Sequence, residues 1–152
     1  MACDNDKVEA MVCGNWKLLR DENLEVCLKS MNYPEEAIQF ILGTKPTLSM
    51  KRSGDTFDIS FELVPGKKQS YSFKLGDDFI VKDDNDPPMY NNKEKITLEG
   101  DTVKIITKSQ LTGPLKIDTE VHLCRKGNEL HQILSALGDR SVVGTRVFVP
   151  DN

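Results

Sequence analysis

The sequence lacks a long apolar run and an excess of basic residues. Its 152 residues include 24 acidic and 20 basic side chains, which gives a net charge of -4. Nucleic-acid-binding proteins need a basic face that displaces counterions from phosphates, so this charge argues against nucleic acid. A membrane-spanning helix needs about 20 consecutive apolar residues, and residues 1–10 are too acidic for a signal peptide. We therefore expect a cytoplasmic protein that binds no nucleic acid.

Residues that could carry catalysis or hold a metal are also scarce. The four cysteines are Cys3, Cys13, Cys27 and Cys124. They show no C-x-x-C spacing, and in a reducing compartment they are most simply free thiols. The two histidines, His122 and His131, alternate with apolar residues in a way that predicts surface positions. There is no phosphate-binding glycine loop and no H-E-x-x-H motif. The sequence thus predicts no enzyme, no metal site and no cofactor.

Two short helices are predicted after a first strand over residues 12–20. Asp21 or Asn23 can cap the first helix. Its apolar positions recur at helical spacing: Leu24, Cys27, Leu28 and Met31. Pro34 is placed to start the second helix and Gly43 to end it.

From Pro46 onward the apolar residues recur with period two, and short Gly-containing turns separate the segments. About ten antiparallel strands joined by short turns favour a closed or nearly closed barrel, because an open sheet would expose its edges. We therefore predict an all-β fold: a ten-stranded up-and-down antiparallel β-barrel with a two-helix lid between the first and second strands. A ten-stranded interior is wide enough to leave a cavity. The barrel domain spans residues 12–150, and residues 1–11 form a short N-terminal extension.

Arg146 stands in the last of these segments, which alternates strictly over residues 142–149. Alternation places it on the same face as Phe148, in a strand that is apolar on both sides. Burying an unpaired charge costs several kcal/mol, so Arg146 requires an anion or fixed acceptors. This indicates a receptor for a ligand carboxylate. The alternative is a salt bridge to a carboxylate of the protein, such as Glu120 or Asp118.

Other polar residues share faces with apolar ones in the late strands. Gln132 lies on the face of Leu130 and Leu134, and Arg125 on the face of Leu123. Several buried polar groups that converge would make a polar end to an apolar chamber. Such a chamber suits an amphipathic ligand with one polar head.

Two segments near the ends of the chain carry a family resemblance: Gly-Asn-Trp-Lys-Leu-Leu at 14–19 and Gly-Thr-Arg-Val-Phe at 144–148. Weaker matches follow between them: Glu22-Asn23-Leu24, Lys45-Pro46-Thr47, Ser53-Gly54-Asp55-Thr56, Phe73-Lys74-Leu75-Gly76, Asp77-Asp78-Phe79 and Thr97-Leu98-Glu99-Gly100. In this order the chain resembles the intracellular lipid-binding proteins, the fatty-acid-binding and retinoid-binding family, from about residue 12 to residue 149. The resemblance implies a calycin-type barrel with Arg146 as the head-group arginine.

The chain also departs from the family's pattern. Phe148 stands where many relatives carry a tyrosine, which removes one hydrogen bond to a carboxylate, worth about 1 kcal/mol. The family's second cavity arginine falls on Leu123. Arg125, two residues along on the same face, either substitutes for that arginine or is solvated beside the turn that follows it. Gln132 could equally donate to a neutral alcohol or aldehyde.

The leading interpretation is a monomeric carrier that binds and transports long-chain fatty acids or similar hydrophobic carboxylates without covalent attachment. One alternative is a binder of retinoids or other neutral lipids, oriented by Gln132. Another is an interaction module that acts through its surface and has a vestigial cavity. The predicted ligand-binding residues are Arg146, Phe148, Arg125, Gln132, Leu123, Leu134, Phe61, Phe73, Leu28 and Pro46.

Two loops differ from the family's pattern as well. The entrance region reads Glu-Leu-Val-Pro-Gly-Lys-Lys at 62–68, so the entrance to the barrel differs from that of the family. Its Lys67 and Lys68 could bring the lid into transient contact with an anionic membrane. The acidic run at 83–88 has the spacing of a calcium loop but carries Pro87 at a ligand position and lacks the required glycine. It predicts a solvated loop.

Overall fold

The structure is a computed structural model that describes residues 3–82, 90–113 and 116–151. The acidic run at 83–88 lies outside the described residues. The elements in chain order are α1 (Asp4–Val12), β1 (Gly14–Glu22), α2 (Leu24–Ser30), α3 (Glu35–Gly43), β2 (Thr47–Ser53), β3 (Thr56–Val64), β4 (Lys67–Phe73), β5 (Asp78–Lys82), β6 (Asn91–Glu99), β7 (Thr102–Ser109), β8 (Thr119–Lys126), β9 (Glu129–Ala136) and β10 (Asp139–Pro150). No helix in this part of the chain is long and apolar enough to cross a membrane.

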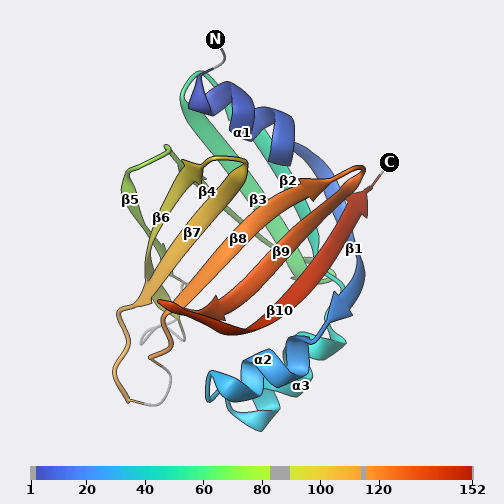
Figure 1. Cartoon of the computed structure of the whole chain (residues 1–152), viewed down its shortest axis with the longest axis vertical. Coiled ribbons are helices and arrows are strands. Elements are labelled where there is room, and N and C mark those ends of the chain that lie inside the picture. The colour runs from blue at the N-terminus through green and yellow to red at the C-terminus, as the bar shows by residue number, and fades with distance from the viewer. Residues whose placement is uncertain (1–2, 83–89, 114–115, 152) are drawn as a thin grey trace.

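The strands form one antiparallel sheet that curls into a nearly closed barrel (Figure 1). Their order is β4-β3-β2-β1-β10-β9-β8-β7-β6-β5, so β1 joins β10 and the two edge strands are β4 and β5. Aromatic side chains close the space between these edges, since Phe79 of β5 stacks on both Tyr71 and Phe73 of β4 with ring centroids 5.6 Å apart in each pair. This confirms the predicted ten-stranded barrel.

The lid consists of α2 and α3, which lie at the opposite end of the barrel from α1 (Figure 1). Asn23 precedes α2 as expected but does not cap it with its side chain. It adopts a left-handed φ of 57°, and its Nδ2 donates to the carbonyl of Val143 at 2.9 Å. The side-chain cap was therefore predicted wrongly, because a carbonyl of β10 offers the Asn23 amide a partner outside the helix.

Gly144 allows the lid to pack directly on β10. A Cβ atom at this position would lie 2.8 Å from the Cβ of Cys27 and 2.9 Å from the Cα of Leu24, both in α2. Beneath the lid, Leu24, Leu28 and Ile38 form a small apolar cluster with Leu134 of β9. The expected helical spacing thus places the apolar face of α2 on the barrel.

The expected extension, residues 1–11, contains most of α1, which covers the other end of the barrel (Figure 1). Val8 and Val12 are fully buried there, and the Nε1 of Trp16 donates to the Val12 carbonyl at 2.9 Å.

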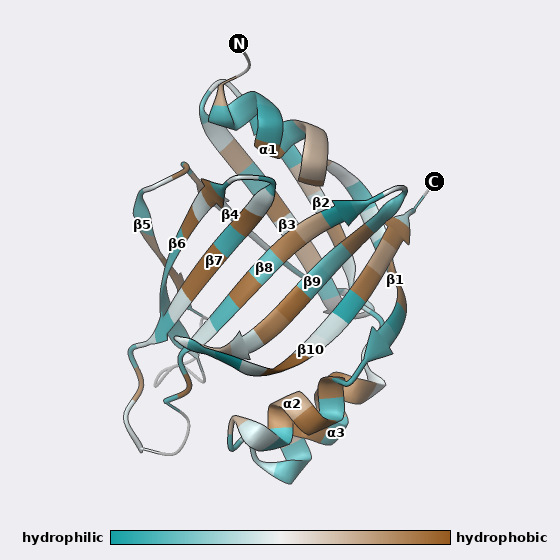
Figure 2. Cartoon of the chain, in the orientation of Figure 1, coloured by the Kyte–Doolittle hydropathy of each residue, from teal (hydrophilic) through white to brown (hydrophobic). Residues whose placement is uncertain are grey.

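Brown and teal segments alternate along the strands in Figure 2, as expected for one face turned inward. The inward residues nearest α1 make the main core, which includes Trp16, Met50, Phe57, Ile59, Phe73, Ile96, Val103, Leu123, Leu130 and Phe148. The barrel is therefore filled at the α1 end, and space for a ligand must be sought toward the lid.

Candidate ligand-binding site

A cavity of about 230 Å³ opens beneath the turn that joins α2 to α3. Its lining mixes aromatic, aliphatic and hydroxyl side chains: Tyr33, Pro34, Ala37, Tyr90, Asn92, Thr107, Ser109, Leu111, Ile117 and Thr119. A second hollow, of about 550 Å³, follows the space between β4 and β5 and shares Tyr90 with the first. Pockets for drug-sized ligands are commonly about 300–1,000 Å³, so a long chain needs the lid or neighbouring side chains to move.

Arg146 lies inside the barrel, and each of its three guanidinium nitrogens donates a hydrogen bond. It is 7% exposed and stands directly opposite Asp21 in the register of β1 and β10. Its Nε donates to Asp21 Oδ1 at 2.8 Å and its Nη2 to Asp21 Oδ2 at 3.3 Å. Arg146 and Asp21 thus form a bidentate ion pair, whose charge-assisted hydrogen bonds are stronger than those between neutral groups.

The same guanidinium also holds the end of α3. Nη1 donates to Thr44 Oγ1 at 3.2 Å, and Nη2 to the carbonyls of Ile41 and Thr44, each at 3.2 Å. A cation at a helix C-terminus is favourable because the last carbonyls carry partial negative charge. Arg146 therefore has a carboxylate partner within the protein, as the alternative interpretation expected. That partner is Asp21, and not Glu120 or Asp118. Arg146 ties together β1, β10 and the lid.

Gln132 lies directly across from Arg146 on β9, and Leu123 lies across from Gln132 on β8. The Gln132 side chain is half-buried and makes no hydrogen bond to the residues that the structure describes. Leu123 and Phe148 belong to the buried core beside α1. These residues form a row across four neighbouring strands, which we call the polar row: Asp21, Arg146, Gln132 and Leu123. It begins with a charged pair, continues with an amide that has no hydrogen bond to a described residue, and ends at an apolar side chain.

Arg125 is exposed and turned toward α1. Its Nη1 donates to the carbonyls of Ala10 and Met11 at 3.4 and 3.2 Å, and its guanidinium carbon lies 5.0 Å from the centre of the Trp16 ring. Neither predicted role describes it, since it neither replaces the missing cavity arginine nor stands free in solvent. Alternation assigned it to the inner face correctly, but at the end of β8 that face meets α1.

The apolar residues of the predicted set separate into four places. Leu28 and Leu134 are under the lid, and Phe73 stacks on Phe57 in the core with ring centroids 5.3 Å apart. Phe61 meets Tyr71 edge to face at 6.1 Å, near the hollow between β4 and β5. Pro46 is buried at the junction of α3 and β2, where its carbonyl accepts from the Leu18 amide.

Sequence reasoning missed Glu94, which faces the interior from β6 between exposed Lys93 and Lys95. It is 9% exposed, and burial raises its pKa from 4.5 to about 7. Its alternation with Ile96 and Leu98 could have identified it, because a charged residue on an apolar face is expensive.

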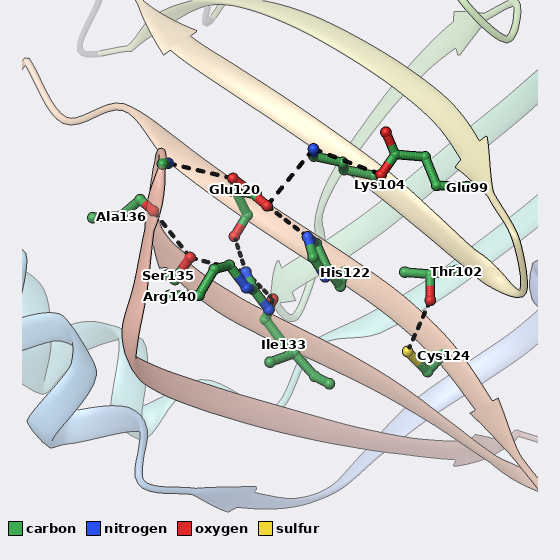
Figure 3. A network of polar contacts seen from close by, with 11 residues as sticks. Glu99, Thr102, Lys104, Glu120, His122, Cys124, Ile133, Ser135, Ala136 and Arg140 are labelled. Atoms are coloured by element: carbon green, nitrogen blue, oxygen red, sulfur yellow. Dashed lines mark hydrogen bonds and ion pairs between the residues drawn. The ribbon is translucent and has the colours of Figure 1, made fainter.

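Both histidines alternate with inward residues of their strands, and each bonds a glutamate. The His122 Nε2 lies 2.6 Å from Glu120 Oε2, which also forms an ion pair with Lys104 (Figure 3). Figure 3 also places Cys124 beside Thr102, separate from that network. His131 is only 7% exposed and lies 2.9 Å from Glu129, so its predicted surface position is wrong. Its cross-strand neighbours are Cys124 of β8 and Val147 of β10.

Comparisons with known proteins agree with this architecture, although no protein-family model matches the chain. Human cellular retinoic acid-binding protein 2 is 29% identical over 138 residues, covering 90% of this chain and 95% of that protein. Fatty acid-binding protein 2 of Manduca sexta is 30% identical over 96 residues, covering 61% and 67%. These relatives are named as binding proteins, which agrees with the expectation that the chain is no enzyme.

Solved structures match the whole barrel. The fatty-acid-binding protein 1 of Echinococcus granulosus superimposes with a TM-score of 0.73 at 19% identity, covering 94% of this chain and 99% of that one. The fluorescent protein UnaG gives the same TM-score at 23% identity and the same coverage. At such identities the likeness establishes the fold.

Proposed function

The chain belongs to the intracellular lipid-binding protein family, and we propose that it binds a long-chain lipid non-covalently inside the barrel and carries it through the cytosol as a monomer. The observation that supports this most is the change in polarity of the inward-facing residues from one end of the barrel to the other. The inward face is apolar beside α1 and mixed beneath the lid, where a cavity of about 230 Å³ opens. Each methylene removed from water contributes about 0.8 kcal/mol, so the chain of the lipid supplies the affinity.

A carboxylate is the first candidate for the head group. The two relatives compared above are named for retinoic acid and fatty acid, both carboxylic acids. Nη1 of Arg146 has two N–H groups and donates only to Thr44 Oγ1 among the described residues. Its second N–H and the amide of Gln132 across the strand could together receive one carboxylate. Long-chain fatty acids are therefore proposed as ligands.

A neutral head group is the second candidate, supported by the pairing of Arg146 with Asp21. The two charges balance, so the polar row carries no net positive charge to attract an anion. Gln132 can donate to and accept from an alcohol, an aldehyde or an amide. A retinoid or another neutral lipid oriented by Gln132 fits this arrangement.

Lipid extraction from the purified protein, followed by mass spectrometry, tests the proposal directly. We expect long-chain lipids at about one per protein. In a second measurement, C18 ligands that differ only in the head group compete with a fluorescent fatty-acid probe. Competition by oleic acid favours the carboxylate, and competition by oleyl alcohol alone favours Gln132. If no apolar ligand displaces the probe and none is extracted, the proposed function is wrong.

A further inference from the structure

Glu94 is the buried charged group that the proposed head-group row leaves unused. It lies opposite Phe79 of β5 and opposite Thr107 of β7 in the strand register. Both neighbours are uncharged. Tyr71 of β4, which stacks on Phe79, also lies near Glu94, and Tyr90 in turn lies near Tyr71 and donates to Gln69.

The carboxyl of Glu94 has no hydrogen bond or ion pair to any residue that the structure describes. Burial alone accounts for the rise of its pKa to about 7. The pKa of Tyr71 is raised by its own burial and then by the nearby Glu94, so the tyrosine stays neutral beside it. A buried polar group without a partner is unusual in a folded protein and requires an explanation.

Glu94 lies beside the lid-side cavity. Thr107, its cross-strand neighbour, lines that cavity, and so does Asn92, two residues away on the same face of β6. Tyr71 lines the hollow between β4 and β5. The carboxyl therefore stands between the two openings, on the wall formed by β5, β6 and β7.

We propose that Glu94 is a second polar anchor of the chamber, which accepts a hydrogen bond from a hydroxyl or amide N–H of a neutral lipid. The inference rests on the proposed function and narrows the class of ligand. A ligand carboxylate would add a negative charge to an interior in which Arg146 is already balanced by Asp21. A neutral donor instead satisfies Glu94 and adds no charge, whether the group belongs to a hydroxylated lipid or to a fatty amide.

Three ligands with the same C18 chain separate charge from hydrogen bonding: oleic acid, N-oleoylethanolamine and methyl oleate. The last is neutral and has no donor. We expect wild-type protein to bind N-oleoylethanolamine about tenfold more tightly than methyl oleate, the ratio expected for one hydrogen bond to a charged or polar buried acceptor. Glu94→Leu should reduce that ratio to less than about threefold.

Glu94→Gln provides the complementary test, because the amide keeps an acceptor and loses the charge. It should retain most of the preference for N-oleoylethanolamine and tighten oleic acid binding severalfold. Glu99→Gln, at the exposed end of the same strand, is the control and should change neither ratio. Circular dichroism and thermal unfolding verify that the variants are folded, and Glu94→Gln alone decides the matter if Glu94→Leu does not fold.

The outcomes distinguish the two proposals. Equal affinity for N-oleoylethanolamine and methyl oleate in wild-type protein, with oleic acid unaffected by Glu94→Gln, overturns the anchor and leaves lipid binding intact. Wild-type protein that binds none of the three ligands overturns the proposed function itself.

Discussion

At the scale of single residues, the pair of Arg146 and Asp21 determines the cost of a change at either position. Arg146→Ala leaves Asp21 and the carbonyl of Thr44 without this donor. The carbonyl of Ile41 keeps the amide and the hydroxyl of Thr44 as donors. Removing one partner of a buried pair costs about 3–5 kcal/mol, and the partial exposure of Asp21 lowers the expectation to about 2–4 kcal/mol. Urea unfolding at pH 7 measures this loss.

The double variant Arg146→Met with Asp21→Leu removes both charges and should recover more than half of that stability. It also allows the effect of Arg146 on ligand affinity to be measured in a folded protein. Should Arg146→Ala unfold at the wild-type urea concentration, the pair is open in solution and the guanidinium is free for a ligand carboxylate.

Glu94 makes stability depend on pH in the direction opposite to most carboxylates. Its folded pKa of about 7 exceeds the ordinary 4.5, so between these values the folded state holds a proton that the unfolded state releases. Stability should therefore fall by roughly 3 kcal/mol as pH rises from 4.5 to 7, and then level off. The difference between wild-type and Glu94→Gln unfolding free energies, measured from pH 4.5 to 8, isolates this contribution; a flat difference contradicts it.

The sequence could predict which residues face the interior, but not which side chains pair across neighbouring strands. Strict alternation from Trp16 through Leu18 and Arg20 would turn Asp21 outward. A bulge between Leu18 and Arg20 shifts the register against β10 and turns Asp21 inward, opposite Arg146. A one-residue bulge is a property of the paired strands and leaves no mark on periodicity. The sequence therefore predicts that Arg146 needs an acceptor, but it cannot identify Asp21 as that acceptor.

At the scale of elements, the two ends of the barrel rest on contacts that single substitutions can test. Arg125 holds the C-terminal carbonyls of α1. Arg125→Ala should cost about 1–2 kcal/mol and speed amide hydrogen exchange in α1, because the helix end loses its cation and its hydrogen bonds. Affinity for oleic acid should not change. A loss of affinity without faster exchange would instead show that Arg125 binds the ligand. Lys126→Ala is the matched control.

The lid end depends on the close approach of α2 to Gly144. Gly144→Ala places a methyl group 2.8 Å from Cys27 Cβ, so α2 must move away from β10. We expect a loss of about 1–3 kcal/mol and faster ligand dissociation in stopped-flow measurements. Gly43→Ala is the control, because a Cβ there meets nothing within 4 Å. An unchanged dissociation rate in Gly144→Ala would mean that ligands leave by another opening.

Other elements show where composition misleads. Residues 1–11 read as an acidic extension, yet Val8 and Val12 are buried when α1 covers the barrel. In so short a segment, two apolar positions four residues apart give a weak helical signal, and most of the stability of a short helix comes from tertiary packing. The partner, here the open end of a barrel, is visible only once the strands are closed.

At the scale of the whole molecule, the lid presents apolar and basic groups on one end. Val26 of α2 and Phe40 of α3 are 55% and 56% exposed. Lys67 and Lys68 are exposed at the start of β4, and the turn before them lies at the lid end because successive hairpins alternate between the two ends of an up-and-down barrel. Together they form a surface that could meet an anionic membrane although the net charge is -4.

Delivery to membranes should follow from this arrangement. Each lysine near an anionic surface contributes about 1 kcal/mol, and salt screens that attraction. Transfer of a fluorescent lipid from the protein to vesicles should therefore quicken with anionic lipid and slow with ionic strength. Lys67→Glu with Lys68→Glu should remove most of this dependence and leave equilibrium affinity unchanged, since neither lysine belongs to the interior.

The control reverses the same number of charges at the other end. Lys51 and Lys126 are exposed beside the turns nearest α1, so Lys51→Glu with Lys126→Glu matches the change in net charge without touching the lid. If both double variants slow transfer equally, the effect is one of overall charge. If transfer ignores vesicle charge and vesicle concentration altogether, the lipid leaves by diffusion through water, and the lysines serve only to keep the turn solvated.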